Sequence, residues 1–117
     1  MTTQEVANRF YELAQEGKFD EILSTLFSKD AKSIEPQVGP FQSVEGLDAI
    51  VEKGKVFNSQ IEEMHGGFTN PPIVAGNFFA CTMGMDVTMK GHPRMNMEEV
   101  AVYEVKDGKI ISEQFFF

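Results

Sequence analysis

The C-terminal segment EVKDGKIISEQFFF constrains the fold of this chain more than any other part of the sequence. Its dipeptide Asp107-Gly108 separates two stretches rich in β-branched and aromatic residues, which predicts a β-hairpin with a two-residue turn. Side chains alternate across a strand, so Phe115 and Phe117 are predicted on one face of the sheet and Phe116 on the other. The end of the chain is therefore predicted to be a paired strand and not a frayed terminus.

The segments before this hairpin predict helices first and strands after. Apolar periodicity places helices from a capping box at Thr2 to Gly17, over residues 19–26, and from about residue 44 to residue 61. A short strand is predicted over residues 32–35, and an antiparallel meander begins at Met64. Its first hairpin turn is predicted at Gly76-Asn77. This order predicts an α+β fold, with three helices packed on one face of a curved, mainly antiparallel sheet.

Length and composition exclude several classes of protein. A chain of 117 residues is predicted to form a single domain over residues 1–117. The net charge of −8 disfavours nucleic-acid binding, and the uncharged stretches are too short to span a membrane. Cys81 is the only cysteine, and the two histidines are far apart, so neither a disulfide nor a metal site is predicted. No cofactor motif is present, and the polar N-terminal segment leads us to expect a cytoplasmic protein.

Three segments of the sequence resemble the SnoaL-like group of the nuclear-transport-factor-2-like superfamily. They are GKFDEILSTLFSKDAKSIEP, VEGLDAI and VYEVKDGKIISEQFFF. The resemblance implies a conical, cystatin-like α+β barrel, in which a strongly bent sheet wraps around a long helix and encloses one pocket. It also implies a homodimer formed through the convex face of the sheet. The superfamily includes ketosteroid isomerases, polyketide cyclases, limonene epoxide hydrolases and dehydratases, and members that only bind or scaffold, so activity must be argued from the site.

Two carboxylates are the candidate catalytic residues. Glu35 precedes Pro36, where the resemblance places the proton-transferring aspartate of ketosteroid isomerases; the alternative is a strand-end glutamate that faces water. Asp86 matches the aspartate of the inward-pointing Arg-x-Asp of epoxide hydrolases, although Gly84 replaces the arginine. Asp86 either lines the pocket, which would leave the methionines of its strand on the convex face, or it belongs to a solvated polar face.

The resemblance also shows which catalytic groups this chain lacks. Phe10 stands where the isomerases have an oxyanion-stabilising tyrosine, and Ala101 stands near their second acid. Phe115 occupies the position of a catalytic acid in the cyclases and epoxide hydrolases. Since phenylalanine and alanine donate no hydrogen bond, none of these reactions carries over with its full set of residues.

Several further residues are candidates for lining the pocket. Gly54, in the middle of a predicted helix, indicates either close packing or space for a ligand. His65 is a candidate base or hydrogen-bonding group, or a histidine satisfied by the backbone. Strand alternation groups Glu99 with Tyr103, and Glu113 with Phe115. Together with Phe10, they complete the predicted ligand-binding set.

Three hypotheses about function remain open at this stage. The first is a domain whose pocket binds a small apolar or amphipathic molecule, without an assigned reaction. The second is an acid–base enzyme, an isomerase, cyclase or dehydratase, that uses pocket carboxylates. The third is a structural or dimerisation domain whose pocket is filled by some of the 11 phenylalanines.

Overall fold

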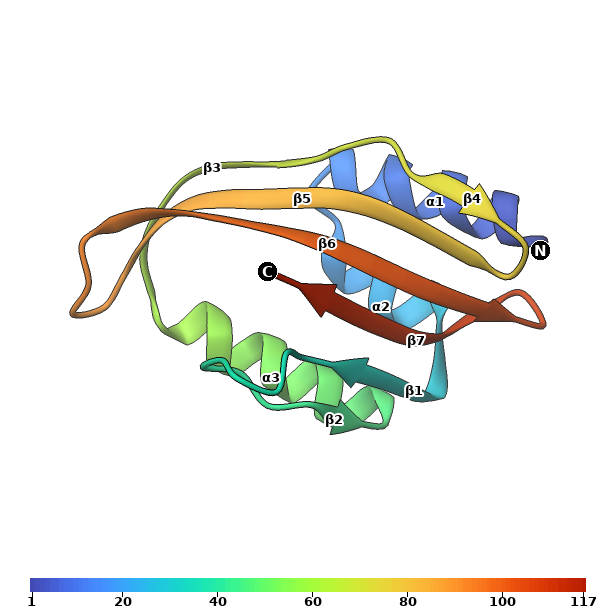
Figure 1. Cartoon of the computed structure of the whole chain (residues 1–117), viewed down its shortest axis with the longest axis horizontal. Coiled ribbons are helices and arrows are strands. Elements are labelled where there is room, and N and C mark those ends of the chain that lie inside the picture. The colour runs from blue at the N-terminus through green and yellow to red at the C-terminus, as the bar shows by residue number, and fades with distance from the viewer.

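The computed structural model describes residues 1–117 as three helices and seven strands (Figure 1). The helices are α1 (Thr3–Gln15), α2 (Phe19–Leu26) and α3 (Leu47–Ser59). The strands are β1 (Phe27–Ile34), β2 (Val44–Glu45), β3 (Ile61–Thr69), β4 (Ile73–Ala75), β5 (Phe78–Met89), β6 (Arg94–Lys106) and β7 (Lys109–Phe116). None of the helices is both long and apolar enough to cross a membrane.

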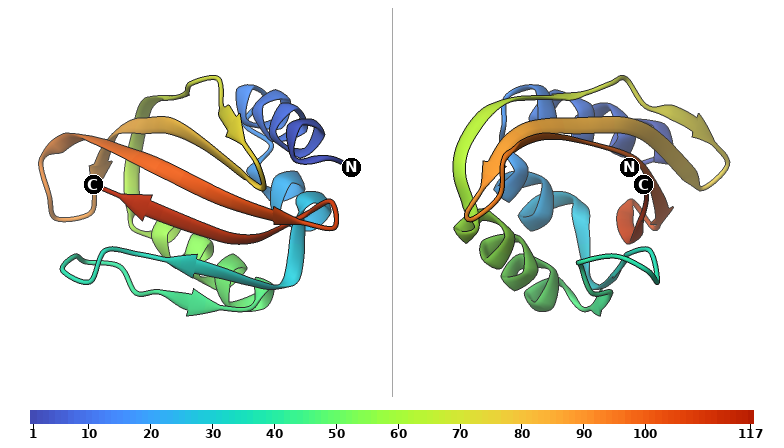
Figure 2. Two further views of the ribbon diagram at one scale, coloured as in Figure 1. Left: turned by 45° about the vertical axis from the view of Figure 1, so that its right-hand side comes forward. Right: turned by 60° about the vertical axis from the view of Figure 1, so that its left-hand side comes forward.

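All seven strands belong to one mixed sheet in the order β2-β1-β7-β6-β5-β3, with β4 paired to the end of β5. The pairing of β1 with β7 is parallel and every other pairing is antiparallel. The sheet bends strongly, and the helices lie inside the bend (Figure 2). The predicted α+β class, with helices on one face of a curved sheet, is confirmed.

The predicted helix signals at the N-terminus are also confirmed. The Thr2 hydroxyl accepts a hydrogen bond from the Glu5 amide at 3.1 Å, and the Glu5 carboxylate accepts one from the Thr2 amide at 2.9 Å. This capping box satisfies two amides that the first turn of α1 leaves free. Gly17, with φ of 71°, follows the last turn in the left-handed conformation that glycine tolerates best.

The C-terminal hairpin has the predicted geometry. Asp107 and Gly108 have φ of 52° and 75°, the two positive values that a type I′ turn requires. The Gly76-Asn77 turn is confirmed as well, between β4 and β5. Because β7 pairs with β6 on one side and β1 on the other, the terminal phenylalanines are anchored in the sheet.

Several boundaries differ from the sequence prediction. The third helix ends at Ser59, and the meander begins at Ile61 and not at Met64. The third helix begins later than predicted, because residues 44–45 form β2 opposite β1 and Gly46 has φ of 96°, which no helix interior allows.

The first strand is longer than predicted and begins at Phe27. The beginning of this strand is hard to recognise in the sequence because residues 28–30 are polar. A register shift against β7 interrupts the alternation of buried and exposed side chains at these residues.

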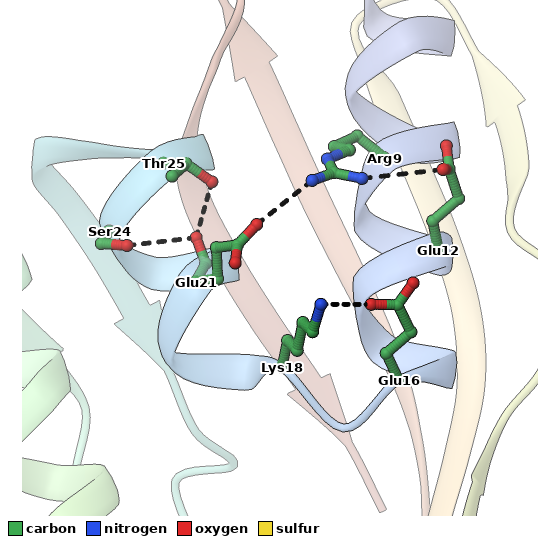
Figure 3. A network of polar contacts seen from close by, with 7 residues as sticks. All are labelled: Arg9, Glu12, Glu16, Lys18, Glu21, Ser24 and Thr25. Carbon is green, nitrogen blue, oxygen red and sulfur yellow. Dashed lines mark hydrogen bonds and ion pairs between the residues drawn. The ribbon is translucent and has the colours of Figure 1, made fainter.

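A network of ion pairs joins α1 to α2 (Figure 3). The Arg9 guanidinium lies 3.1 Å from the Glu21 carboxylate and 3.6 Å from that of Glu12, and Lys18 lies 2.7 Å from Glu16. All of these side chains are largely exposed to solvent, so the pairs contribute little to stability. The two helices are held mainly by their apolar faces, which bury Leu13 and Ile22.

We call the concave face of the sheet, which packs against α1 and α3, the inner face, and the opposite one the outer face (Figure 2). Near α1 the inner face is a dry core, where the Phe10 ring lies 5.4 Å from Phe79 and 4.7 Å from Tyr103. Away from this core, inner side chains such as Met83 and Met97 are only half-buried. The core therefore occupies one end of the concave face and leaves the other end more open.

Candidate functional site

The open end of the inner face is organised by Lys53 on α3. Its ammonium donates to the Ser33 hydroxyl at 2.6 Å and to the Glu35 carboxylate at 2.8 Å. Ser33 is fully buried, and the Lys53 and Glu35 side chains are 21% and 9% exposed. Because water competes little here, this ion pair fixes the end of β1 against α3.

Glu113 of β7 lies beside this ion pair. The parallel pairing sets it opposite Ser33, and only 8% of the residue is exposed. Burial raises the pKa of the Glu113 carboxyl, while a hydrogen bond with Ser33 and the charge of Lys53 partly oppose the rise. Glu113 is thus a buried carboxyl whose protonated form is favoured.

Glu99 of β6 is the second carboxyl with a perturbed pKa. Burial raises the pKa of Glu99 to about 7, and the negative charges of Glu35 and Glu113 add to the rise, which Lys53 opposes in part. A carboxyl with this pKa gives up and takes back a proton close to neutral pH. Unlike Glu113, the half-buried Glu99 retains access to the space in front of the inner face.

Tyr103 connects these carboxyls to the dry core. Its ring stacks on Phe79 at 4.8 Å with an interplanar angle of 16°, and the residue is only 3% exposed. Burial, followed by the charge of Glu113, raises the pKa of the Tyr103 hydroxyl well above its usual value. The hydroxyl makes no hydrogen bond within the protein. Every side-chain polar atom that is fully shielded from solvent does have a partner. The hydroxyl is therefore not fully enclosed, and its raised pKa keeps it neutral.

Aromatic rings border the polar side chains on the side away from the core. The Phe115 ring centroid lies 5.8 Å from the Lys53 ammonium, a cation–π distance. Beyond it, Phe41 packs edge-on against Phe57 at 5.5 Å and Phe117 at 6.4 Å. The inner face thus changes from apolar core to polar side chains to an aromatic rim.

We call the six polar residues between the core and the rim the carboxylate cluster. They are Ser33, Glu35, Lys53, Glu99, Tyr103 and Glu113. The cluster combines a carboxylate held by an ammonium with two carboxyls that favour their protonated form, an arrangement suited to moving protons. No group of histidine, cysteine and acidic side chains is arranged to hold a metal ion.

Five of the candidate residues lie in or beside this cluster. Glu35, Glu99, Tyr103, Glu113 and Phe115 all lie on the inner face. Phe10 lies behind Tyr103 as a core residue, 3% exposed, so its ring supports the site without facing the open space. Phe116 is exposed on the outer face, which follows the predicted alternation of the three terminal phenylalanines.

The expectation that Asp86 joins Glu35 in the pocket is wrong. Asp86 lies on the outer face, where its carboxylate accepts two hydrogen bonds from Arg94, at 2.9 and 2.7 Å. The hydrogen bond from Arg94 lowers the pKa of Asp86, so this carboxylate stays ionised. Arg94 lies opposite the neighbouring Thr88 across the β5–β6 hairpin, and this pairing stabilises Asp86 on the solvent side. The methionines of β5 therefore face inward.

His65 lies outside the expected pocket, whereas Gly54 remains a candidate for it. The His65 ring lies 2.8 Å from the Thr88 hydroxyl and 3.7 Å from the Glu63 carboxylate, on the outer side with Asp86. At Gly54, an added Cβ would meet no atom within 4 Å, so close packing does not explain this glycine. Open space at Gly54 is consistent with the other expectation, that it leaves room for a ligand.

Lys53 and Ser33, which organise the site, were not among the residues predicted from the sequence. A signal for Lys53 was present: it lies three residues after Ile50 and four before Phe57, at the helical spacing of the inner stripe. A lysine at such a position needs an acidic partner, and Glu35 is the nearest one. Ser33 gave no signal, because its role depends on the parallel pairing of β1 with β7.

The outer face presents a different surface. A hollow of about 390 Å³ lies on the outer face. Its apolar lining on that face consists of the side chains of Phe68, Val100 and Phe116. The Phe68 ring covers Gly84, where an added Cβ would come within 2.6 Å of the ring. These three side chains, each more than 40% exposed, form an apolar outer patch.

Comparison with known proteins agrees with this architecture. The model of the SnoaL-like domain family matches residues 1–117. A Mesorhizobium loti protein, provisionally described as a SnoaL-like polyketide cyclase, is 35% identical over 100% of both chains, with a TM-score of 0.94.

Two more distant structures share the fold alone. A Xanthomonas campestris protein with a cystatin-like fold is 21% identical, with a TM-score of 0.72 over 99% of this chain and 90% of that one. A Catenulispora acidiphila protein with a ketosteroid-isomerase-like fold, in complex with trimethylamine, is 20% identical, with a TM-score of 0.74 over 99% and 87%. No curated protein matches the sequence.

Proposed function

The chain belongs to the SnoaL-like domain family, and from this premise we propose that its inner face binds a small apolar or amphipathic molecule. In this proposal the apolar part of the ligand lies against the methionines and the aromatic rim. Its polar part faces the carboxylate cluster. Ligand sites of this kind combine a mainly apolar lining with a few convergent polar groups.

The carboxylate cluster is the observation that carries this proposal. Glu113 and Tyr103 are more than 90% buried, and neither the Tyr103 hydroxyl nor the Glu99 carboxyl has a hydrogen-bond partner in the protein. A domain with a purely structural role gains nothing from unpaired polar groups beside its core, because apolar residues of the same size pack at lower cost. The complex of the Catenulispora acidiphila protein with trimethylamine supports the expectation that this fold accepts a small organic molecule.

A screen of small amphipathic compounds tests the proposal. Binding is measured by thermal shift and mapped by methyl NMR of the methionines, of which Met83, Met85 and Met97 lie on the inner face. We expect hits to perturb these methyls and to weaken in Glu99→Gln, while Asp86→Asn on the outer face leaves binding unchanged. A screen without hits in any chemical class would instead favour a structural domain.

A second candidate function, acid–base catalysis, is favoured by one specific observation. Glu35 is held by Lys53 at 2.8 Å, while the pKa of Glu99 is raised to about 7 by burial. Such different surroundings let one carboxyl act as a base and the other as an acid. Isomerisation, cyclisation and dehydration each require such a pair. In this scheme Glu35 takes a proton from the substrate and Glu99 gives one to it.

Proton exchange next to a carbonyl group tests this second function. Exchange of α-hydrogens of small cyclic ketones for deuterium is followed by NMR, with and without the protein. Catalysis predicts a faster exchange that both Glu35→Gln and Glu99→Gln abolish and that Asp86→Asn preserves. Exchange at the buffer rate for every ketone, despite binding, would leave the domain as a binding protein.

We further propose that the chain forms a homodimer through its outer face. The apolar outer patch of Phe68, Val100 and Phe116 lies on β3, β6 and β7, and it supplies an apolar centre for such an interface. Sedimentation of the protein and of Phe116→Glu tests this. We expect a dimer that the substitution converts to a monomer; a monomeric wild type at micromolar concentration contradicts the proposal.

A further inference from the structure

We propose that the ligand of the inner face carries a primary ammonium group on an apolar body, and that the ammonium is bound by Glu99, Glu113 and Tyr103. This inference rests on the proposed function, since it names the chemical class that the same site takes. Its support comes from the charge balance of the site, from unpaired hydrogen-bond acceptors, and from the space in front of them.

The charge balance of the carboxylate cluster favours a cation. The cluster holds three carboxyls, of Glu35, Glu99 and Glu113, and a single ammonium, that of Lys53. Lys53 is paired directly with Glu35, so the other two carboxyls have no cationic partner of their own. Burial favours the protonated form of these two carboxyls because an unpaired buried carboxylate is costly, and a bound cation stabilises the ionised form instead.

Three groups on the inner face have unused capacity to accept hydrogen bonds. Tyr103 and Glu99 have no donor in the protein, and Glu113 has only the Ser33 hydroxyl. Tyr103 is 3% exposed, and its hydroxyl has no hydrogen-bond partner. The residue lies on the inner face beside Glu113, to which it is paired between β6 and β7. Glu99 lies on the same face, four residues before Tyr103 in β6, and accepts no hydrogen bond. A primary ammonium has three N–H donors, which is the number these three acceptors require.

The surroundings of these acceptors suit an apolar body. Half-buried Met83, Met97 and Phe115 flank Glu99 and Glu113 on the inner face. On the opposite side, α3 presents Gly54, where an added Cβ would meet no atom within 4 Å. Gly54 lies one helical turn after Ile50, which is 4% exposed, so this open space lies on the side of α3 that faces the sheet.

Binding of an ammonium group is coupled to release of a proton. The carboxyl of Glu99, with its pKa of about 7, carries a proton in about half of the molecules at pH 7. When an already charged ammonium binds, this proton passes to the buffer and the resulting carboxylate pairs with the ligand. The titratable groups that surround Glu99 and share in this equilibrium are Glu35, Lys53, Cys81, Tyr103 and Glu113.

Four probes that share one ring test the proposal: cyclohexylammonium, cyclohexanol, cyclohexanecarboxylate and trimethylcyclohexylammonium. Titration calorimetry at pH 7 in two buffers of different ionisation enthalpy measures affinity and proton release together. We expect cyclohexylammonium to bind at least about tenfold more tightly than the neutral and anionic probes, the effect of one charge-assisted contact. The trimethylated probe, which lacks N–H donors, is expected to bind more weakly than the primary one.

Matched variants locate the binding. Glu99→Gln is expected to weaken cyclohexylammonium at least about tenfold and to reduce proton release, and Tyr103→Phe to weaken it several-fold. Glu98→Gln removes the exposed carboxylate of the adjacent residue, on the outer face, and is expected to change neither quantity. Preference for cyclohexanol or cyclohexanecarboxylate overturns the ammonium assignment but retains a small-molecule site. Equal effects of Glu98→Gln and Glu99→Gln also overturn the ammonium assignment. If neither the four probes nor the screened library binds, both the ammonium assignment and the proposed function are overturned.

Discussion

The inner and outer faces of the same strands hold similar groups in different surroundings. On the outer face Asp86 and Arg94 form a bidentate pair at 2.7 and 2.9 Å, with side chains 31% and 62% exposed. On the inner face Glu35 and Lys53 make a single contact at 2.8 Å, with side chains 9% and 21% exposed. The outer pair has the more complete geometry, yet water and salt screen it. Burial, and not contact geometry, distinguishes the inner face, where the pKa values of Glu99 and Glu113 are raised.

The largest expected difference between the faces concerns Phe79 and Phe78, which are adjacent in β5. Phe79 is 1% exposed and stacks on Tyr103, whereas Phe78 points outward and is 47% exposed. Phe79→Ala is expected to lower the free energy of unfolding by about 3–5 kcal/mol, and Phe78→Ala by less than about 1 kcal/mol. Urea denaturation measures both, and similar losses would mean that the two faces are assigned wrongly.

The two ion pairs provide the next comparison. Lys53→Met leaves the buried Glu35 carboxylate without its partner, and we expect the free energy of unfolding to fall by about 2–3 kcal/mol. Arg94→Met, which breaks the exposed pair with Asp86, is expected to leave stability almost unchanged. The same denaturation experiment measures both variants. A larger loss for Arg94→Met would contradict the view that burial decides the strength of these pairs.

A smaller effect is expected in the pH dependence of stability. Burial raises the pKa of Glu99 from 4.5 to about 7, and the pKa of Glu113 rises for the same reason. Between these values the folded state retains a proton that the unfolded chain has released. Stability is therefore greatest below the unfolded pKa, falls as the pH rises from 4.5 to 7, and levels off above the folded pKa.

For Glu99 we expect this fall to be roughly 1–2 kcal/mol, less than the full linkage value because the carboxyl keeps contact with solvent. Glu99→Gln, which cannot ionise at this position, should reduce the slope to the share of Glu113 and be more stable than the wild type at pH 8. Glu98→Gln, on the exposed side of the same strand, should keep the slope. Thermal unfolding across this pH range measures the profile of each variant. An unchanged slope in Glu99→Gln would contradict the raised pKa of Glu99.

Most of the fold could be predicted from local signals. Asp107-Gly108 and the Thr2 capping box each specify the backbone around them, and both appear as predicted. The start of α3 and the length of β1 could not be predicted, because they depend on pairing with distant strands. The β-strand propensity of residues 28–30 does not indicate with which strand they pair.

The site was less predictable than the fold. Strand alternation correctly grouped Glu99 with Tyr103 and Glu113 with Phe115, since it fixes which side chains share a face. It does not fix which face points inward, and for this reason Asp86 was placed on the wrong side. Lys53 went unnoticed because a lysine in a helix is usually solvated, and only the tertiary structure brings Glu35 to its side chain.

The most direct test of a protonatable site on the inner face is an NMR titration of the side-chain carboxyl carbon of Glu99. The signal is assigned by its absence in Glu99→Gln and followed between pH 3 and 9. We expect a midpoint at about 7, moved to lower pH when cyclohexylammonium is present. A midpoint at the ordinary value of 4.5, unaffected by any ligand, would contradict this expectation.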